Sequence, residues 1–151
     1  MIVKFKKLNE NAVKPIKAHA DDFCFDVVAT SCEEIAPNVY KYGTGIALQI
    51  NERNKSMSNR RGAILGIDLR PRSSVWKTGM VLSNGIGTID AGYTGEISAV
   101  FYHVMPNMPR YKVGDRIAQL CISHTYSIIF DETYELEHTE RGSGGYGSTG
   151  K

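Results

Sequence analysis

Residues 84–96 read NGIGTIDAGYTGE, and the rest of the chain is interpreted outward from this stretch. Its four glycines allow sharp bends that expose peptide N–H and C=O groups, and one carboxylate, Asp90, and one aromatic ring, Tyr93, lie among them. Strand-type residues follow from Ile97 to Val104, so we expect a hairpin held between two strands rather than a free loop. The stretch therefore predicts a rigidly supported binding pocket.

The composition indicates a single intracellular domain. The chain has 151 residues, of which 42% are hydrophobic, enough to fill one core. Its 18 basic and 16 acidic residues give a net charge of +2, so we expect no stable nucleic-acid complex and no membrane association. The three cysteines have no Cys-x-x-Cys spacing, and no apolar run has the length of a signal peptide or a membrane span. These features favour a cytoplasmic protein, of cellular or viral origin.

Short strand-like runs recur along the chain, with turn residues between them and no helical period longer than two turns. This pattern predicts an all-β, single-domain fold, a jelly-roll-like β-barrel. We expect residues 40–45 to form a turn, 51–61 to form a solvated basic loop, and 128–130 to be the last core strand before an acidic linker at 131–140. A nucleic-acid patch is the weaker interpretation of the basic loop, because it lacks interleaved aromatic residues. The expected strands are 2–8, 21–29, 46–50, 63–69, 97–104, 117–123 and 128–130.

The segment Arg70-Pro71-Arg72-Ser73-Ser74 follows one of these strands directly. Proline ends the strand, and a short helix is expected to begin at the serines and stop at Gly79. Hydroxyl groups and an arginine at a helix start are suited to an anion, but serines there also serve as plain caps. Both interpretations of Arg72 and its serines stay open.

Two further polar residues stand inside strand-like runs. Asp26 is expected on the strand face opposite Phe25 and Val27, and an ordinary solvated carboxylate is the favoured interpretation from the residues alone. Gln119 interrupts an apolar run, and an unpaired buried amide costs roughly 1–3 kcal/mol. Its amide must therefore find either partners within the protein or a ligand.

The C-terminal residues 141–151 read RGSGGYGSTGK and cannot bury enough surface to fold alone. We therefore divide the chain into a β-barrel domain at 1–140 and a flexible glycine-rich arm at 141–151. The arm is either disordered or a flap that orders on binding. In the second case its N–H groups, its hydroxyl groups and Arg141 could surround a polyphosphate while Tyr146 lies on a flat ring.

Taken in order, five segments resemble the motifs of the trimeric dUTP pyrophosphatase (dUTPase) family. Any one of these matches would be weak, but five in order with sensible spacing form a specific signal. The segments are residues 25–27 (FDV), 71–74 (PRSS), 84–96, 114–120 (GDRIAQL) and 141–150 (RGSGGYGSTG).

The resemblance implies a jelly-roll homotrimer with three active sites at subunit interfaces. Each site would take the 84–96 stretch from one subunit, the first, second and fourth motifs from a neighbour, and the arm from the third. The implied reaction is hydrolysis of dUTP to dUMP and pyrophosphate with Mg²⁺, which limits uracil entry into DNA and supplies dUMP for thymidylate synthesis.

The resemblance also assigns roles to residues. Asp90 would be the general base for water attack at the α-phosphorus, Tyr93 would stack under the deoxyribose and exclude a 2′-hydroxyl, and Asp26 would support Arg72 from behind. No residue would bind the metal directly, because Mg²⁺ would lie on the triphosphate and reach the protein through water. The other expected substrate-binding residues are Asn84, Gly87 and Ile89 for uracil, Arg72, Ser73, Ser74 and Gln119 for the phosphates, and Arg141, Tyr146, Gly147, Ser148 and Thr149 in the closing arm.

Four positions depart from the family pattern, and two other functions remain alternatives. The first motif, usually Ala-Gly-Tyr-Asp-Leu, keeps its acid but not its small pair, Ser74 replaces a glycine, Gly92 replaces an acid, and Tyr146 replaces a phenylalanine. A dCTP deaminase of the same fold would need a different reader of the base edge. A phage-type regulator would retain nucleotide binding as a switch.

Overall fold

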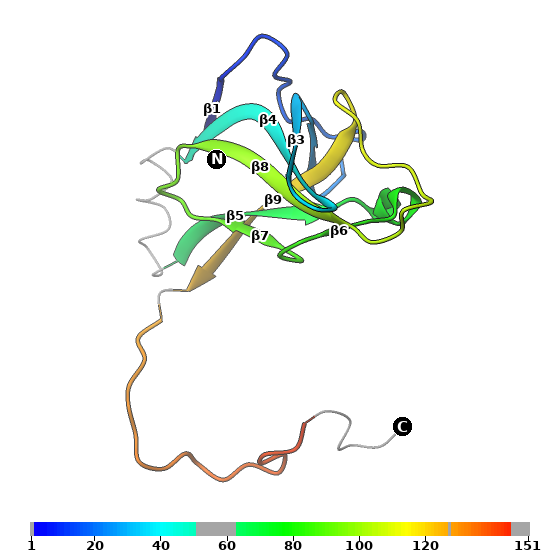
Figure 1. Ribbon diagram of the computed structural model, residues 1–151. Helices are drawn as coiled ribbons and strands as arrows, with labels where there is room; N and C mark the ends of the chain where they lie inside the picture. Colours follow the sequence, from blue (N-terminus) through cyan, green and yellow to red (C-terminus); the bar gives the residue numbers. More distant parts are fainter. Residues whose placement is uncertain (1, 51–62, 127, 146–151) are drawn as a thin grey trace.

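The computed structural model describes residues 2–50, 63–126 and 128–145 of the chain. Within these ranges nine β-strands form two antiparallel sheets, and one short 3-10 helix follows β5 (Figure 1). One sheet has the order β1-β4-β8-β6, with β3 also paired to β4, and the other has the order β2-β9-β5-β7. The expected all-β single domain is therefore confirmed. The bounds are β1 Val3–Lys7, β2 Phe25–Val28, β3 Ser31–Ala36, β4 Val39–Ile50, β5 Ala63–Pro71, η1 Ser73–Thr78, β6 Met80–Leu82, β7 Gly87–Ile89, β8 Glu96–His103 and β9 Arg116–Tyr126.

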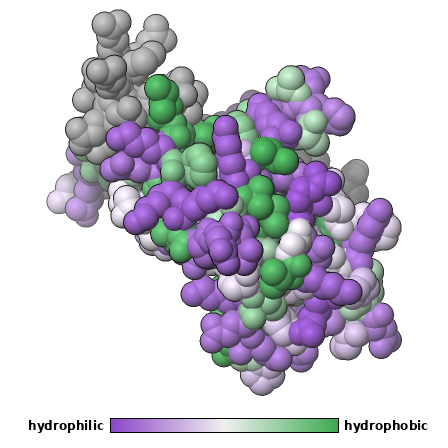
Figure 2. Space-filling model, turned by 90° about the horizontal axis from the view of Figure 1, so that it is seen from above, coloured by the Kyte–Doolittle hydropathy of each residue, from purple (hydrophilic) through white to green (hydrophobic). Residues whose placement is uncertain are grey.

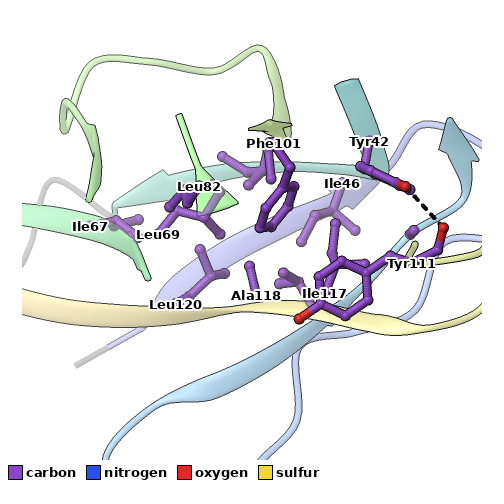
Figure 3. Close-up of a cluster of buried hydrophobic side chains, with 14 of the residues drawn as sticks. Tyr42, Ile46, Ile67, Leu69, Leu82, Phe101, Tyr111, Ile117, Ala118 and Leu120 are labelled. Carbon is purple, nitrogen blue, oxygen red and sulfur yellow. Dashed lines mark hydrogen bonds between the residues drawn. The ribbon is translucent and has the colours of Figure 1, made fainter. Parts of the chain in front are cut away.

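One hydrophobic core lies between the two sheets (Figure 3). Tyr42 from β4 and Phe101 from β8 meet edge to face with their ring centroids 5.9 Å apart, an arrangement that aromatic pairs prefer. The hydroxyl of Tyr42 is fully buried and donates a hydrogen bond of 2.9 Å to the carbonyl oxygen of Tyr111. This bond ties the loop before β9 to the opposite sheet.

The stretch 84–96 passes through both sheets. β6 and β8 pair with one another in the first sheet, whereas β7 between them pairs with β5 in the second, with Ile89 opposite Ile67. The expected hairpin is therefore wrong in part, because the flanking strands do pair but the chain crosses to the other sheet before it returns. The stretch receives backbone support from both sheets as a result.

The helix expected after Pro71 is present as η1, and Gly79 ends it with a φ of 60° in the left-handed region, where glycine is favoured. Of the two interpretations of the serines left open, plain capping does not hold, because Arg72 occupies the N-cap position and no side-chain capping hydrogen bond is made. No helix in the described ranges is long and apolar enough to cross a bilayer.

Two other expectations are wrong. Residues 40–45 lie inside β4, where an irregular register between Gly43 and Ala47 absorbs the local bend. Residues 128–130 do not form a core strand: the chain leaves the body after β9, and Ile129 and Phe130 are 90% and 95% exposed (Figure 1). The basic loop 51–61 lies outside the described residues, and residues 131–140 are exposed, as expected.

The surface of the described chain mixes polar and apolar side chains. The face seen in Figure 2 is largely hydrophilic, with separate apolar patches among the polar side chains. Large apolar side chains are exposed at scattered positions, and the C-terminal segment has five of them within nine residues. These residues are Ile128, Ile129, Phe130, Tyr134 and Leu136.

Replacing Tyr42 by phenylalanine tests the link between the two sheets. The ring still fits, but the buried carbonyl of Tyr111 loses its donor, so we expect the free energy of unfolding to fall by about 1–2 kcal/mol. Urea unfolding measures this as a lower midpoint with an unchanged slope. Tyr102→Phe, at a ring 48% exposed, is the control and should change stability by less than about 0.5 kcal/mol. Equal stability of wild type and Tyr42→Phe would contradict the assignment.

Candidate active site

Asp26, in the middle of β2, is 5% exposed and accepts three side-chain hydrogen bonds. Its Oδ1 accepts from Nε of Arg72 at 3.0 Å and from Nε2 of Gln119 at 3.1 Å. Its Oδ2 accepts from Nη1 of Arg116 at 3.0 Å. We call these four residues the Asp26 cluster. The interpretation of Asp26 as an ordinary solvated carboxylate is wrong, and the amide of Gln119 finds its partner within the protein.

Strand register explains why these side chains meet. In the ladder between β2 and β9, Asp26 lies directly opposite Gln119. The ladder shifts between Val27 and Val28, which pairs Arg116 with Val28 and brings its side chain within reach of the carboxylate. Arg72 arrives from the end of β5, the other neighbour of β9.

The Asp26 cluster carries two guanidinium groups and one carboxylate, an excess of one positive charge. Arg72 also donates from Nη1 to the hydroxyl of Ser74 at 3.3 Å, while Ser73 is exposed at the start of η1. A forked cation with adjacent hydroxyl groups is suited to phosphate oxygens. The anion interpretation of the 71–74 segment is favoured by this geometry, since Ser74 accepts from Arg72 and caps no helix.

The second group of expected residues lines one cavity of about 260 Å³, which we call the 84–96 cavity. The side chains of Asn84, Asp90 and Tyr93 border it, and Asp90 is exposed, so its carboxylate is open to solvent. Gly87 and Ile89 also line it, so all five residues expected from this stretch are brought together.

Local contacts position Tyr93 and Asn84. The N–H of Tyr93 donates to the carbonyl of Asp90 at 2.9 Å, and its hydroxyl donates to the carbonyl of Glu96 at 3.1 Å. A Cβ on Gly95 would lie 2.5 Å from the Tyr93 hydroxyl oxygen, so only glycine lets the ring fold back in this way. A Cβ on Gly87 would lie 3.1 Å from the amide nitrogen of Asn84. Gly95 thus permits the folded-back ring of Tyr93, and Gly87 leaves room for the amide of Asn84.

One chain does not bring all of the expected residues together. The 84–96 cavity has no lining residue in common with the Asp26 cluster. Arg141 is exposed in the C-terminal segment, where its Nε donates to the carbonyl of Gly144 at 3.0 Å. The remaining expected arm residues, Tyr146, Gly147, Ser148 and Thr149, lie outside the described residues.

Sequence reasoning assigned no role to several polar residues of these sites. Arg116 belongs to the Asp26 cluster, and only the irregular register, which the sequence does not signal, brings it there. Glu96 accepts from the N–H of Gly45 at 2.8 Å and so anchors the end of the 84–96 stretch to β4. Asp68 pairs with Arg70 at 3.0 Å on the same sheet face as Gln119. The alternation of polar residues in IDLR, residues 67–70, could have signalled this last pair.

Comparison with known proteins identifies relatives over nearly the whole chain. A family model described as dUTPase matches residues 17–150. The deoxyuridine 5'-triphosphate nucleotidohydrolase of Corynebacterium glutamicum is 35% identical over 151 residues, covering 99% of this chain and 95% of that protein.

Two solved phage structures are similar in fold. The Staphylococcus bacteriophage 80alpha dUTPase with dUPNHPP, described as controlling transfer of virulence genes by a proto-oncogenic G protein-like mechanism, has a TM-score of 0.79 at 26% identity and covers 99% of both chains. A mutant dUTPase from phage phi11 of S. aureus, described with a structural Mg(II) ion, has a TM-score of 0.68 at 23% identity, covering 91% of this chain and 100% of that chain. The second likeness supports the fold alone.

Replacing Asp26 by asparagine tests the Asp26 cluster. The two arginines lose their counter-charge, so we expect the free energy of unfolding to fall by about 2–3 kcal/mol, less than for a fully buried pair because both arginines stay partly in water. Urea unfolding with an unchanged slope measures the loss. Asp131→Asn, in the exposed C-terminal segment, is the matched control. A midpoint for Asp26→Asn equal to that of the control would contradict a structural role for this carboxylate.

Proposed function

This chain belongs to the dUTPase family, and on that premise we propose how its own residues hydrolyse dUTP to dUMP and pyrophosphate. The activity is that of a dUTP diphosphatase. The observation that carries the residue roles is the gathering of Asn84, Asp90 and Tyr93 around one cavity of about 260 Å³. The reaction limits uracil entry into DNA and supplies dUMP for thymidylate synthesis.

Asp90 is the proposed general base. Its carboxylate lines the 84–96 cavity and is exposed, so a water molecule can reach it. That water attacks the α-phosphorus in line, its proton passes to Asp90, and pyrophosphate leaves. A positioned carboxylate base contributes through proton transfer in the transition state.

Base and sugar selection follow from the same cavity. The amide of Asn84 and the backbone groups of Gly87 and Ile89 pair with the uracil edge, and cytosine is rejected because its reversed donor and acceptor would leave buried groups unpaired. The ring of Tyr93 lies under the deoxyribose, held by its hydrogen bond to the carbonyl of Glu96. A 2′-hydroxyl has no room above the ring.

The phosphates are proposed to lie on the Asp26 cluster of a neighbouring copy. Arg72, Ser73, Ser74 and Gln119 supply donors there, and Asp26 holds Arg72 and Gln119 in place. The separation of cluster and cavity within one chain supports a site made by different copies. The exposed apolar side chains of 128–136 support the same conclusion, since burial against a neighbour removes them from water.

We infer a homotrimer, with a domain at 1–140 and an arm at 141–151 that closes over a neighbouring site. In the arm, Tyr146 covers the uracil, while Arg141, Gly147, Ser148 and Thr149 contact the phosphates. Lid closure of this kind excludes water and completes the site.

Magnesium fits these residues through the substrate. Both oxygens of Asp26 already accept from cationic or amide donors, and in the described ranges no three metal-binding side chains gather. A Mg²⁺ ion bound with the triphosphate would supply charge neutralisation and Lewis acidity there. The protein residues themselves bind the phosphates and orient the α-phosphorus toward the water.

A substrate panel with pyrophosphate detection tests this function. We expect kcat/KM for dUTP to exceed that for UTP, dCTP and dTTP by at least about a hundredfold, the scale on which a polar mismatch discriminates. Equal rates on UTP and dUTP would contradict the role of Tyr93. Release of ammonia from dCTP in place of pyrophosphate from dUTP would instead support the deaminase alternative.

Asp90→Asn tests the base. The amide keeps the size of the side chain but cannot take a proton, so kcat should fall by about two to four powers of ten while nucleotide binding is retained. Single-turnover kinetics and calorimetric titration with a non-hydrolysable dUTP analogue measure the two effects. Asp21→Asn, an exposed acid outside the cavity, is the control. Near-normal turnover of Asp90→Asn would assign proton transfer to another group.

A further inference from the structure

Beside the Asp26 cluster the second sheet carries two cysteines that the proposed reaction does not use. β2 and β9 run antiparallel, with Phe25 opposite Leu120 and Asp26 opposite Gln119. Continued by one residue beyond the start of β2, this register places Cys24 opposite Cys121 of β9. Because side chains alternate between the faces of a strand, both thiols lie on the same face as the Asp26 carboxylate.

The backbone geometry places the Cα atoms of this pair at a separation that a disulfide can bridge. The N–H and C=O groups of Asp26 bond to Ile16, on the side of β2 away from β9. Asp26 and Gln119 are therefore a non-hydrogen-bonded pair, and Cys24 stands two residues earlier on the same edge. Residues opposite one another in such pairs have Cα atoms about 4.5 Å apart, within the range of roughly 4.4–6.8 Å found in disulfides.

The two thiols are near enough to interact electrostatically, and they differ in access. Burial raises the pKa of the Cys24 thiol, and the charge of Cys121 and a hydrogen bond with its thiol raise this pKa further. Cys121 is 1% exposed, whereas Cys24 is only partly covered, so a small oxidant reaches Cys24 first.

Charged groups of both signs lie beside the pair: Arg70, Lys17, and the carboxylate of Asp68, which stands opposite Cys121 in the ladder of β5 and β9 and accepts a hydrogen bond of 3.0 Å from Arg70. Arg70 and Lys17 both favour the charged form of Cys24 and so lower its pKa, in opposition to burial. The Nε of Arg70 is buried without a hydrogen-bond partner, although both cysteines act electrostatically on this arginine. A sulfur anion beside it would satisfy that unpaired donor. This observation is independent of the strand register and also points to thiolate chemistry at this place.

We propose that Cys24 and Cys121 form a redox pair, which a peroxide oxidises to a disulfide between β2 and β9 beside the Asp26 cluster. The Cys24 thiolate attacks one oxygen of hydrogen peroxide, giving a sulfenic acid and hydroxide. The Cys121 thiolate then attacks the Cys24 sulfur and displaces a second hydroxide. With the two thiol protons, the balance is two thiols and one peroxide giving one disulfide and two waters.

Oxidation changes the neighbouring phosphate donors. The two sulfur atoms are drawn to a bond length of about 2.05 Å, and each belongs to a residue two positions from Asp26 or Gln119. We expect the shift to misplace these donors and to raise KM for dUTP several-fold, with a smaller change in kcat. A dithiol reductant restores KM. This consequence rests on the proposed role of the Asp26 cluster, whereas formation of the bond does not.

The test treats the full-length protein with hydrogen peroxide and measures intact mass, free thiols and the linked peptides. The expected result is loss of two hydrogen atoms, protection of two of the three thiols and a Cys24–Cys121 peptide. Cys24→Ser, at the partly exposed position, should abolish the product, as should Cys121→Ala. Cys32→Ser, at an exposed position in β3, is the control and should retain it. Because the thiolate is the attacking species, oxidation should be faster at pH 9 than at pH 7.

Absence of the Cys24–Cys121 peptide, or cross-linking through Cys32 in its place, would overturn the proposal. A disulfide that forms while KM stays constant would overturn its effect on the phosphate donors. Failure of the substrate panel would overturn the proposed residue roles but leave the mass result standing. The two failures are therefore distinguishable.

Discussion

Asp26 accepts hydrogen bonds from Arg72, Arg116 and Gln119, which reach it from the end of β5 and from two positions of β9. A carboxylate this buried is costly unless it is paired, and two arginines without it would repel one another. The cluster therefore fixes where Arg72 and Gln119 point, and the 71–74 segment with its serines follows from the position of Arg72. Its excess positive charge leaves capacity for an anion.

The chain divides its chemistry between two places. The stretch 84–96, supported by both sheets, carries groups that suit a nucleobase, a sugar and proton transfer. The Asp26 cluster carries groups that suit phosphates. The proposed assembly would bring the two places together, and the exposed apolar C-terminal segment is the physical argument for copies to associate. Cys24 and Cys121 belong to the same sheet face as the cluster, so the proposed oxidation would act on the proposed phosphate donors.

Alternating patterns predicted the all-β fold and most strands, because period-2 burial is a local property. Asp26 was misjudged from local pattern because its burial depends on β9, about ninety residues further along, and on a ladder irregularity that no residue type signals. Residues 128–130 are predicted as a core strand because an apolar run indicates burial, yet in this chain Ile129 and Phe130 are exposed, and local pattern does not show that the chain leaves the body after β9. The crossing of 84–96 between sheets was missed for a related reason: β6 and β8 do pair, and only the partner of β7 distinguishes a crossing from a hairpin.

Subunit complementation is the most direct test of a site built from different copies. Asp90→Asn and Arg72→Gln each remove one half of the chemistry, and each variant alone should be nearly inactive. The two variants are unfolded together and refolded as an equal mixture. A site that takes Asp90 from one copy and Arg72 from another is intact only when both copies carry the unchanged residue, and each does so with a probability of one half. We predict about a quarter of wild-type dUTP hydrolysis in the mixture. Activity no higher than that of the separate variants would contradict the account.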